Sequence, residues 1–188
     1  EVSPAWVPTK FNVDEVKEVV GKFIGTLKNV YSFFSTYANI DDFDVAKYPA
    51  SWQKTAEIDR WIVSRLQTLI KKVNEWNEVF EFTRSVRAIQ DFVIDEVSNW
   101  YVRRSRRRFW SMELTEDKID AYVTLHQVMT ELSKLMAPYA PYLSDLLYQN
   151  LTGLESVHFA DYPEAEEQNI DAKLEEEMQT IIDIVSMG

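Results

Sequence analysis

Apolar residues recur at intervals of three and four along most of the chain, with charged residues between them. Residues at these intervals share one face of a helix, so the pattern predicts amphipathic helices that bury their apolar faces. Six segments show it, at about 12–34, 57–80, 83–109, 115–136, 141–153 and 171–185. The short links between them predict an all-α fold, an antiparallel bundle of five to six helices.

The segment 83–109 is the longest predicted helix. At about 1.5 Å per residue it would form a rod close to 40 Å long. Its apolar stripe consists of Val86, Ile89, Val93, Val97 and Trp100. The first helix, 12–34, carries a similar broad face, and we expect that face to be buried along its whole length.

The chain divides into three predicted parts. Residues 1–11 contain Pro4 and Pro8 and show no periodicity, so we expect a linker to something upstream. Residues 12–153 form the bundle, and 154–188 form a connector and an acidic last helix. In the connector, Val157 and Phe159 alternate like a short extended strand. The last helix is expected to turn these residues inward: Leu174, Met178, Ile181, Ile182 and Val185.

Charge is segregated along the chain, whose net charge is −11. The segment from Arg84 to Trp110 contains seven arginines and three acids, a net charge of +4. Between Glu155 and Asp183 ten acids face one lysine, a net of −9. The acidic average therefore conceals a local basic site. The acids 175–177 are consecutive, so on a helix they point in several directions and predict a solvated face rather than an acid–base pair.

The sequence lacks the residues that several classes of function require. The chain has no Cys, which excludes disulfides and thiolate metal sites and permits a cytoplasmic location. His126 and His158 fall on different predicted elements, so a zinc site is not expected, and His126 is interpreted as a surface or boundary residue. Neither a GxxxxGK[ST] phosphate loop nor a GxSxG elbow is present, and no apolar run is long enough for a membrane span.

Five arginines fall within six residues near the end of the long helix, in the segment 99–110 (NWYVRRSRRRFW). Two or three cations would suffice to complement the dipole of the helix C-terminus. Aromatic residues bracket the run on both sides, which favours a folded surface over a disordered basic tail. Arginine binds phosphate and stacks on bases, and aromatic rings stack on any base, so the segment predicts RNA binding, preferably to a single-stranded loop.

These segments also carry a resemblance. Residues 78–93 (EVFEFTRSVRAIQDFV) and 98–110 (SNWYVRRSRRRFW) resemble the central helix of the anticodon-binding domain in isoleucyl-tRNA synthetases, a class I family. Residues 22–34 (KFIGTLKNVYSFF), 135–142 (LMAPYAPY) and 155–163 (ESVHFADYP) agree, so the likeness covers about 12–188. The Trp–Tyr pair is shared broadly within class I, so the same domain of a valyl- or leucyl-tRNA synthetase is an alternative.

The resemblance implies a non-catalytic module that recognises the tRNA anticodon stem-loop. The adenylation signatures HIGH and KMSKS are missing, so the upstream part would hold the catalytic site, using ATP with Mg, and the chain itself would need no cofactor. The implied partners are an isoleucine tRNA and the missing catalytic domain, with neither DNA nor a membrane, and the implied location is cytoplasmic. A helical protein–protein or interdomain module is the rival reading, favoured by the acidic last helix.

A helix advances about 100° per residue, so the side of the helix on which each residue of the segment 99–110 lies can be calculated. Trp100, Arg104 and Arg107 continue the apolar stripe, so they are predicted to be structural. The other candidates are predicted to bind tRNA: Asn99, Arg103 and Arg106 on one flank, Tyr101 and Arg108 on the other, and Arg84 and Arg87 farther up the rod, where they would contact the stem or only aid solubility.

Overall fold

A computed structural model describes residues 12–48 and 55–187, and every regular element in this part of the chain is helical. The sequence-based prediction of an all-α bundle is confirmed. The predicted linker 1–11 lies outside the described residues. Between Asp44 and Tyr48 the chain forms a short 3-10 helix, η2 (Val45–Lys47).

Each predicted helix is present. Two of them are long rods that each include a π-helical segment, in which hydrogen bonds span five residues rather than four. The first rod comprises α1 (Val13–Val19), η1 (Val20–Ile24) and α2 (Gly25–Ile40), and the second comprises α4 (Phe82–Asp91), η3 (Phe92–Val102) and α5 (Arg103–Phe109). The remaining α-helices are α3 (Glu57–Glu78), α6 (Glu116–Met136), α7 (Pro141–Thr152) and α8 (Ala172–Met187).

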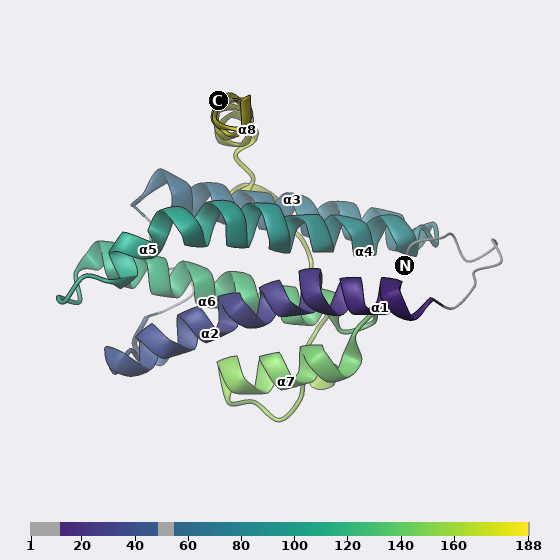
Figure 1. Cartoon of the computed structure of the whole chain (residues 1–188), viewed down its shortest axis with the longest axis horizontal. Helices are drawn as coiled ribbons and strands as arrows, with labels where there is room; N and C mark the ends of the chain where they lie inside the picture. The colour runs from purple at the N-terminus through teal and green to yellow at the C-terminus, as the bar shows by residue number, and fades with distance from the viewer. Residues whose placement is uncertain (1–11, 49–54, 188) are drawn as a thin grey trace.

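The long helices lie side by side with alternating directions, as Figure 1 shows. The C-terminal ends of α2 and α5 and the N-terminal end of α6 gather at one end of the bundle, on the left of the figure. The second rod packs against α2, α3 and α6, while α7 covers α6 from the other side. The end of α5, which carries the arginines, is therefore held by several neighbours.

Aromatic packing anchors that end of the bundle. The buried Phe109 ring lies with its centroid 5.0 Å from those of Phe33 and Tyr122, in edge-to-face arrangements that stabilise aromatic pairs. Tyr122 also stacks on Phe43 at 4.5 Å. The last turn of the arginine helix is thus fixed to α2 and α6 through a single deeply buried ring.

Burial departs from the prediction in the first rod. Leu27, Val30 and Phe34 are buried as expected, but Val16 and Val20 are about half exposed. The reason is that the core cluster meets this rod only from its middle onward, so the apolar face of α1 extends beyond the described helices that could cover it.

The connector is not strand-like between its two apolar residues. Residues Val157–Phe159 form a 3-10 turn, η4, and the backbone is extended at the flanking Ser156 and Ala160. A turn separates the directions of its side chains, so Val157 is buried while Phe159 is exposed. The prediction that these two residues belong to a short extended strand is therefore wrong.

The last helix crosses the bundle, and Figure 1 views it end-on above the other helices. Leu174, Met178 and Ile182 pack inward as predicted, but Ile181 and Val185 are exposed. One narrow side of α8 contacts the core, because the helix crosses the bundle rather than lying along it.

One acid of the run 175–177 attaches α8 to α3. The Glu175 carboxylate accepts hydrogen bonds from Ser64 Oγ at 2.5 Å and Thr68 Oγ1 at 2.8 Å, and pairs with Arg65 at 3.0 Å. Glu176 and Glu177 are exposed. The prediction of a solvated acidic face is right for these two and wrong for Glu175, whose partners lie more than a hundred residues earlier in the chain.

We expect Glu175→Ala to lower the free energy of unfolding by about 2 kcal/mol, because hydrogen bonds to a partly buried charge are lost. Glu176→Ala, which removes an exposed neighbour, should change it by less than about 0.5 kcal/mol. Urea unfolding measures both, and amide exchange should accelerate in α8 for the Glu175 variant alone. Equal effects from the two variants would contradict this role of Glu175.

Candidate nucleic-acid interface

The π-helical segment η3 determines which residues of the second rod face the core. Its inward residues and those of the flanking α-helices keep a constant spacing of four: Ile89, Val93, Val97, Tyr101, Ser105 and Phe109. In an α-helix a step of four residues turns about 40° past a full circle, so five such steps would rotate the stripe by about 200°. A π-helix holds more residues per turn, which keeps this row on the buried side.

Three arginines and an asparagine are exposed on the outer side of the rod. We call Asn99, Arg103, Arg106 and Arg107 the basic face. None of the three arginines forms an ion pair with a carboxylate within the described residues. Asn99 also borders a hollow of about 480 Å³ between η3 and α8. The face therefore presents three cations whose hydrogen-bond donors are available to an anion.

Arg104 and Arg107 do not continue the buried stripe, because both are exposed. The arithmetic that placed them inside assumed an unbroken α-helix and was wrong beyond η3. Arg104 lies with its guanidinium 3.7 Å from the ring centroid of Trp100, so it covers the outside of that side chain. Trp100 itself is buried, as predicted.

Arg108 and Tyr101 belong to an internal cluster rather than to an RNA-facing flank. Arg108 donates two hydrogen bonds to the two carboxylate oxygens of Asp59, at 2.8 and 2.6 Å, and a third to the backbone oxygen of Asp117. Tyr101, which has no exposed surface, donates to Asp59 at 2.6 Å. The assignment of these two residues to RNA contact is therefore corrected: they join α3, η3, α5 and α6.

The protonation states in this cluster are fixed by its burial. Burial raises the pKa of Tyr101 well above its ordinary value, and the negative charge of Asp59 raises it further. For Arg108, burial opposes the charged form, but the hydrogen bonds and charge of Asp59 outweigh it and raise the pKa. A neutral phenol and a charged guanidinium thus persist at any physiological pH.

A second buried cluster holds the link that follows the arginines. Lys118 is buried, donates a hydrogen bond to the backbone oxygen of Ser111 at 2.6 Å, and pairs with Asp41 at 2.5 Å. Tyr122 donates a hydrogen bond to the same carboxylate. Burial raises the pKa of Tyr122, and this hydrogen bond raises it further. Sequence reasoning missed both clusters, although a charge inside an apolar stripe, such as Lys118 beside Ile119, is a signal of one.

Arg84 and Arg87 are exposed on α4, far from the basic face. Arg84 lies 5.4 Å from the ring centroid of Trp76, and Arg87 acts electrostatically on Asp91. About 20 residues of helix separate them from Arg106, a distance of about 30 Å. A single RNA loop cannot contact both groups, so a role for Arg84 and Arg87 in binding a stem remains a prediction.

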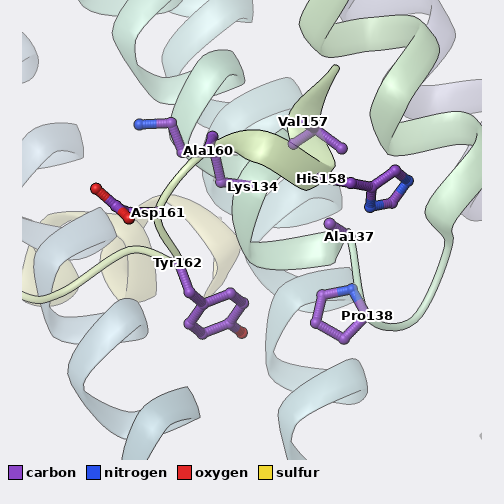
Figure 2. Close-up of a pocket in the computed structure, with 8 residues that line it drawn as sticks. All are labelled: Lys134, Ala137, Pro138, Val157, His158, Ala160, Asp161 and Tyr162. Atoms are coloured by element: carbon purple, nitrogen blue, oxygen red, sulfur yellow. The ribbon is translucent and has the colours of Figure 1, made fainter.

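The two histidines form no site within the part of the chain that is described, where no metal-ligand cluster occurs. His126 is half-buried and shares a hydrogen bond of 2.9 Å with the backbone oxygen of Leu151, and burial lowers its pKa. His158 borders a hollow of about 220 Å³ between the end of α6 and the connector. In Figure 2 it lies at the opposite end of this hollow from Asp161.

The fold and the basic face together define a helical domain with exposed arginines at one end. A family model described as the anticodon-binding domain of tRNA ligase matches residues 59–188. The chain belongs to this family.

Curated relatives match the chain over nearly its whole length. The isoleucine–tRNA ligase of Porphyromonas gingivalis is 49% identical over 186 residues, which is 98% of this chain and 16% of the relative. The isoleucine–tRNA ligase of Clostridium acetobutylicum is 46% identical, covering 99% of this chain and 18% of the relative. That of Bacteroides thetaiotaomicron is 45% identical, covering 98% and 16%. The resemblance to the isoleucine enzymes is confirmed, and the chain spans less than a fifth of their length.

No helix in the described residues is both long enough and apolar enough to cross a membrane.

Proposed function

We propose that the chain binds the anticodon stem-loop of an isoleucine tRNA, within an ATP-dependent isoleucine–tRNA ligase that acts in the cytoplasm. The observation that carries this proposal is the basic face, where Arg103, Arg106 and Arg107 are exposed and form no ion pair with an acid of residues 12–48 and 55–187. The family and the names of the relatives support the choice of tRNA and of isoleucine.

The chemistry of the basic face suits a folded RNA loop. A guanidinium presents a planar fork of donors that matches phosphate oxygens, and it can also stack on a base. The buried ion pairs of Arg108 and Lys118 hold the backbone on both sides of the last turn, so the arginine stems start from fixed positions. Binding then orders fewer groups, which reduces its entropic cost.

The organisation of the longer protein is part of the proposal. Residues 12–153 form the tRNA-binding bundle, 154–188 form the connector and acidic helix, and the catalytic domain lies upstream of 1–11. ATP and Mg²⁺ belong to that catalytic domain, because the adenylation signatures HIGH and KMSKS are missing from this chain. Within this chain the basic face selects and positions the tRNA and carries out no chemistry.

A second function, contact with another protein domain, is favoured by the far end of the bundle. Val79, Phe80 and Phe82 are exposed at the turn between α3 and α4, and Phe80 has a φ of 61°. Positive φ is costly for a bulky residue, so the backbone is strained where apolar groups are presented to solvent. This end lies away from the basic face, so both functions are compatible.

Salt titration tests the proposed function. The chain should bind an isoleucine-tRNA anticodon stem-loop with an affinity that falls as salt rises, with a log–log slope of about −0.7 for each phosphate contact. Three contacts give a slope of about −2. Fluorescence anisotropy with a labelled stem-loop measures it. An unrelated stem-loop of equal length that binds equally well would leave only a nonspecific basic patch.

A further inference from the structure

Trp110 shares the exposed side of the rod with the three arginines. Residues 103, 106, 107 and 110 follow the spacing i, i+3, i+4 and i+7, which places them on one helical face. Helical geometry continues to Trp110, whose backbone N–H donates to the Arg106 oxygen at 3.1 Å. Its neighbour Phe109 is buried, so the position of Trp110 is set by the core.

Unlike the other described tryptophans, Trp110 has an indole ring that is neither buried nor covered by a described arginine. Trp61 is buried, and Arg84 and Arg104 cover the rings of Trp76 and Trp100. Trp110 is 54% exposed and makes no ring or cation contact with the described residues. Trp and Arg are enriched among the residues that contribute most to binding, so an exposed indole beside arginines that form no ion pair within the described residues is typical of a binding surface.

A base from an unpaired RNA segment fits this arrangement. An indole offers a flat surface on which any base stacks, and nearby guanidinium groups can hold the phosphates that flank it. Bases inside a duplex stack on one another and cannot reach such a ring, so a double helix would use the arginines alone. Trp110 therefore distinguishes a loop from a stem, which the cations do not.

We propose that Trp110 is the stacking platform for one unpaired base of the RNA loop whose phosphates bind Arg103, Arg106 and Arg107. This assignment rests on the proposed function and adds to it the residue that selects single-stranded RNA. Trp110 acts by direct contact with RNA and carries no part of the core.

The experiment compares Trp110→Ala, Trp110→Phe and the unchanged chain. Trp110→Ala should weaken binding of the anticodon stem-loop about tenfold, which corresponds to about 1.4 kcal/mol, and Trp110→Phe should retain most of the affinity. A duplex with the same stem and no loop should bind all three proteins alike. Met112→Ala is the matched control, because Met112 is 99% exposed on the adjoining link and lies outside the helical face.

The outcomes separate the inference from the proposed function. If the unchanged chain fails to bind the stem-loop, the proposed function falls and this inference with it. If the chain binds but Trp110→Ala binds the stem-loop as tightly as the unchanged chain, the platform is overturned and the proposed function stands. Equal losses for loop and duplex would also overturn it, because the ring would then have no preference for unpaired bases. All variants are measured below their melting temperatures, with circular dichroism confirming the fold.

Discussion

Asp59→Ala is expected to lower the free energy of unfolding by about 3–5 kcal/mol, among the largest effects available to one substitution in this chain. Asp59 has no exposed surface, and it accepts two hydrogen bonds from Arg108 and one from Tyr101. Its removal leaves a mostly buried guanidinium and a buried hydroxyl without their main acceptor. Urea or thermal unfolding of the chain, followed by circular dichroism, measures the loss.

A double-mutant cycle establishes the cause. Replacing both members of a buried ion pair by apolar residues often costs less than removing one, so Asp59→Leu combined with Arg108→Met should be more stable than the sum of the single changes predicts. Arg107→Ala is the control, since it removes an exposed arginine one residue away and should change stability by less than about 0.5 kcal/mol. If the effects of Asp59→Leu and Arg108→Met on the free energy of unfolding simply add, the two side chains are not coupled and the ion pair is not the cause of the loss.

The helices could be predicted from the sequence because their formation depends on local spacing. The segment 83–109 was predicted as one rod, and the described rod runs from Phe82 to Phe109. Its buried stripe was predicted correctly from Ile89 to Trp100 but mispredicted at Arg104 and Arg107, because a period of 3.6 residues was applied across a π-helical segment. The sequence did contain a signal: apolar or small residues every four positions from Ile89 to Phe109 favour a larger number of residues per turn than an α-helix has.

The internal clusters could not be predicted from spacing at all. Asp59 and Arg108 are 49 residues apart, and Ser64 and Glu175 are 111 apart. Their pairing depends on which helix ends meet in the bundle, which is a property of the tertiary packing. A basic segment in a sequence therefore indicates a site without showing which of its cations are structural: here Arg108 is internal, whereas Arg107 is not.

Replacing Arg103, Arg106 and Arg107 together by alanine is expected to weaken binding of the anticodon stem-loop on the order of 100-fold at 0.1 M salt. Each phosphate contact with single-stranded RNA contributes a slope of about 0.7 to the dependence of log affinity on log salt, so three contacts contribute about two units of log affinity. The slope itself should become shallower by about 2. Stability should barely change, because all three side chains are exposed and unpaired within the described residues.

A charge-matched variant decides whether position or net charge is responsible. Alanine at Lys28, Lys72 and Lys173 also removes three exposed cations, from α2, α3 and α8, and should reduce affinity only a few-fold through long-range electrostatics. A loss equal to that of the arginine variant would mean that the whole surface attracts RNA and that no basic face exists.

Arg104→Ala completes the set: because the guanidinium of Arg104 lies over Trp100, its removal should affect binding less than Arg106→Ala does. If Arg104→Ala instead weakened binding most, the RNA would lie over Trp100 and not on the side defined by Arg103, Arg106 and Arg107.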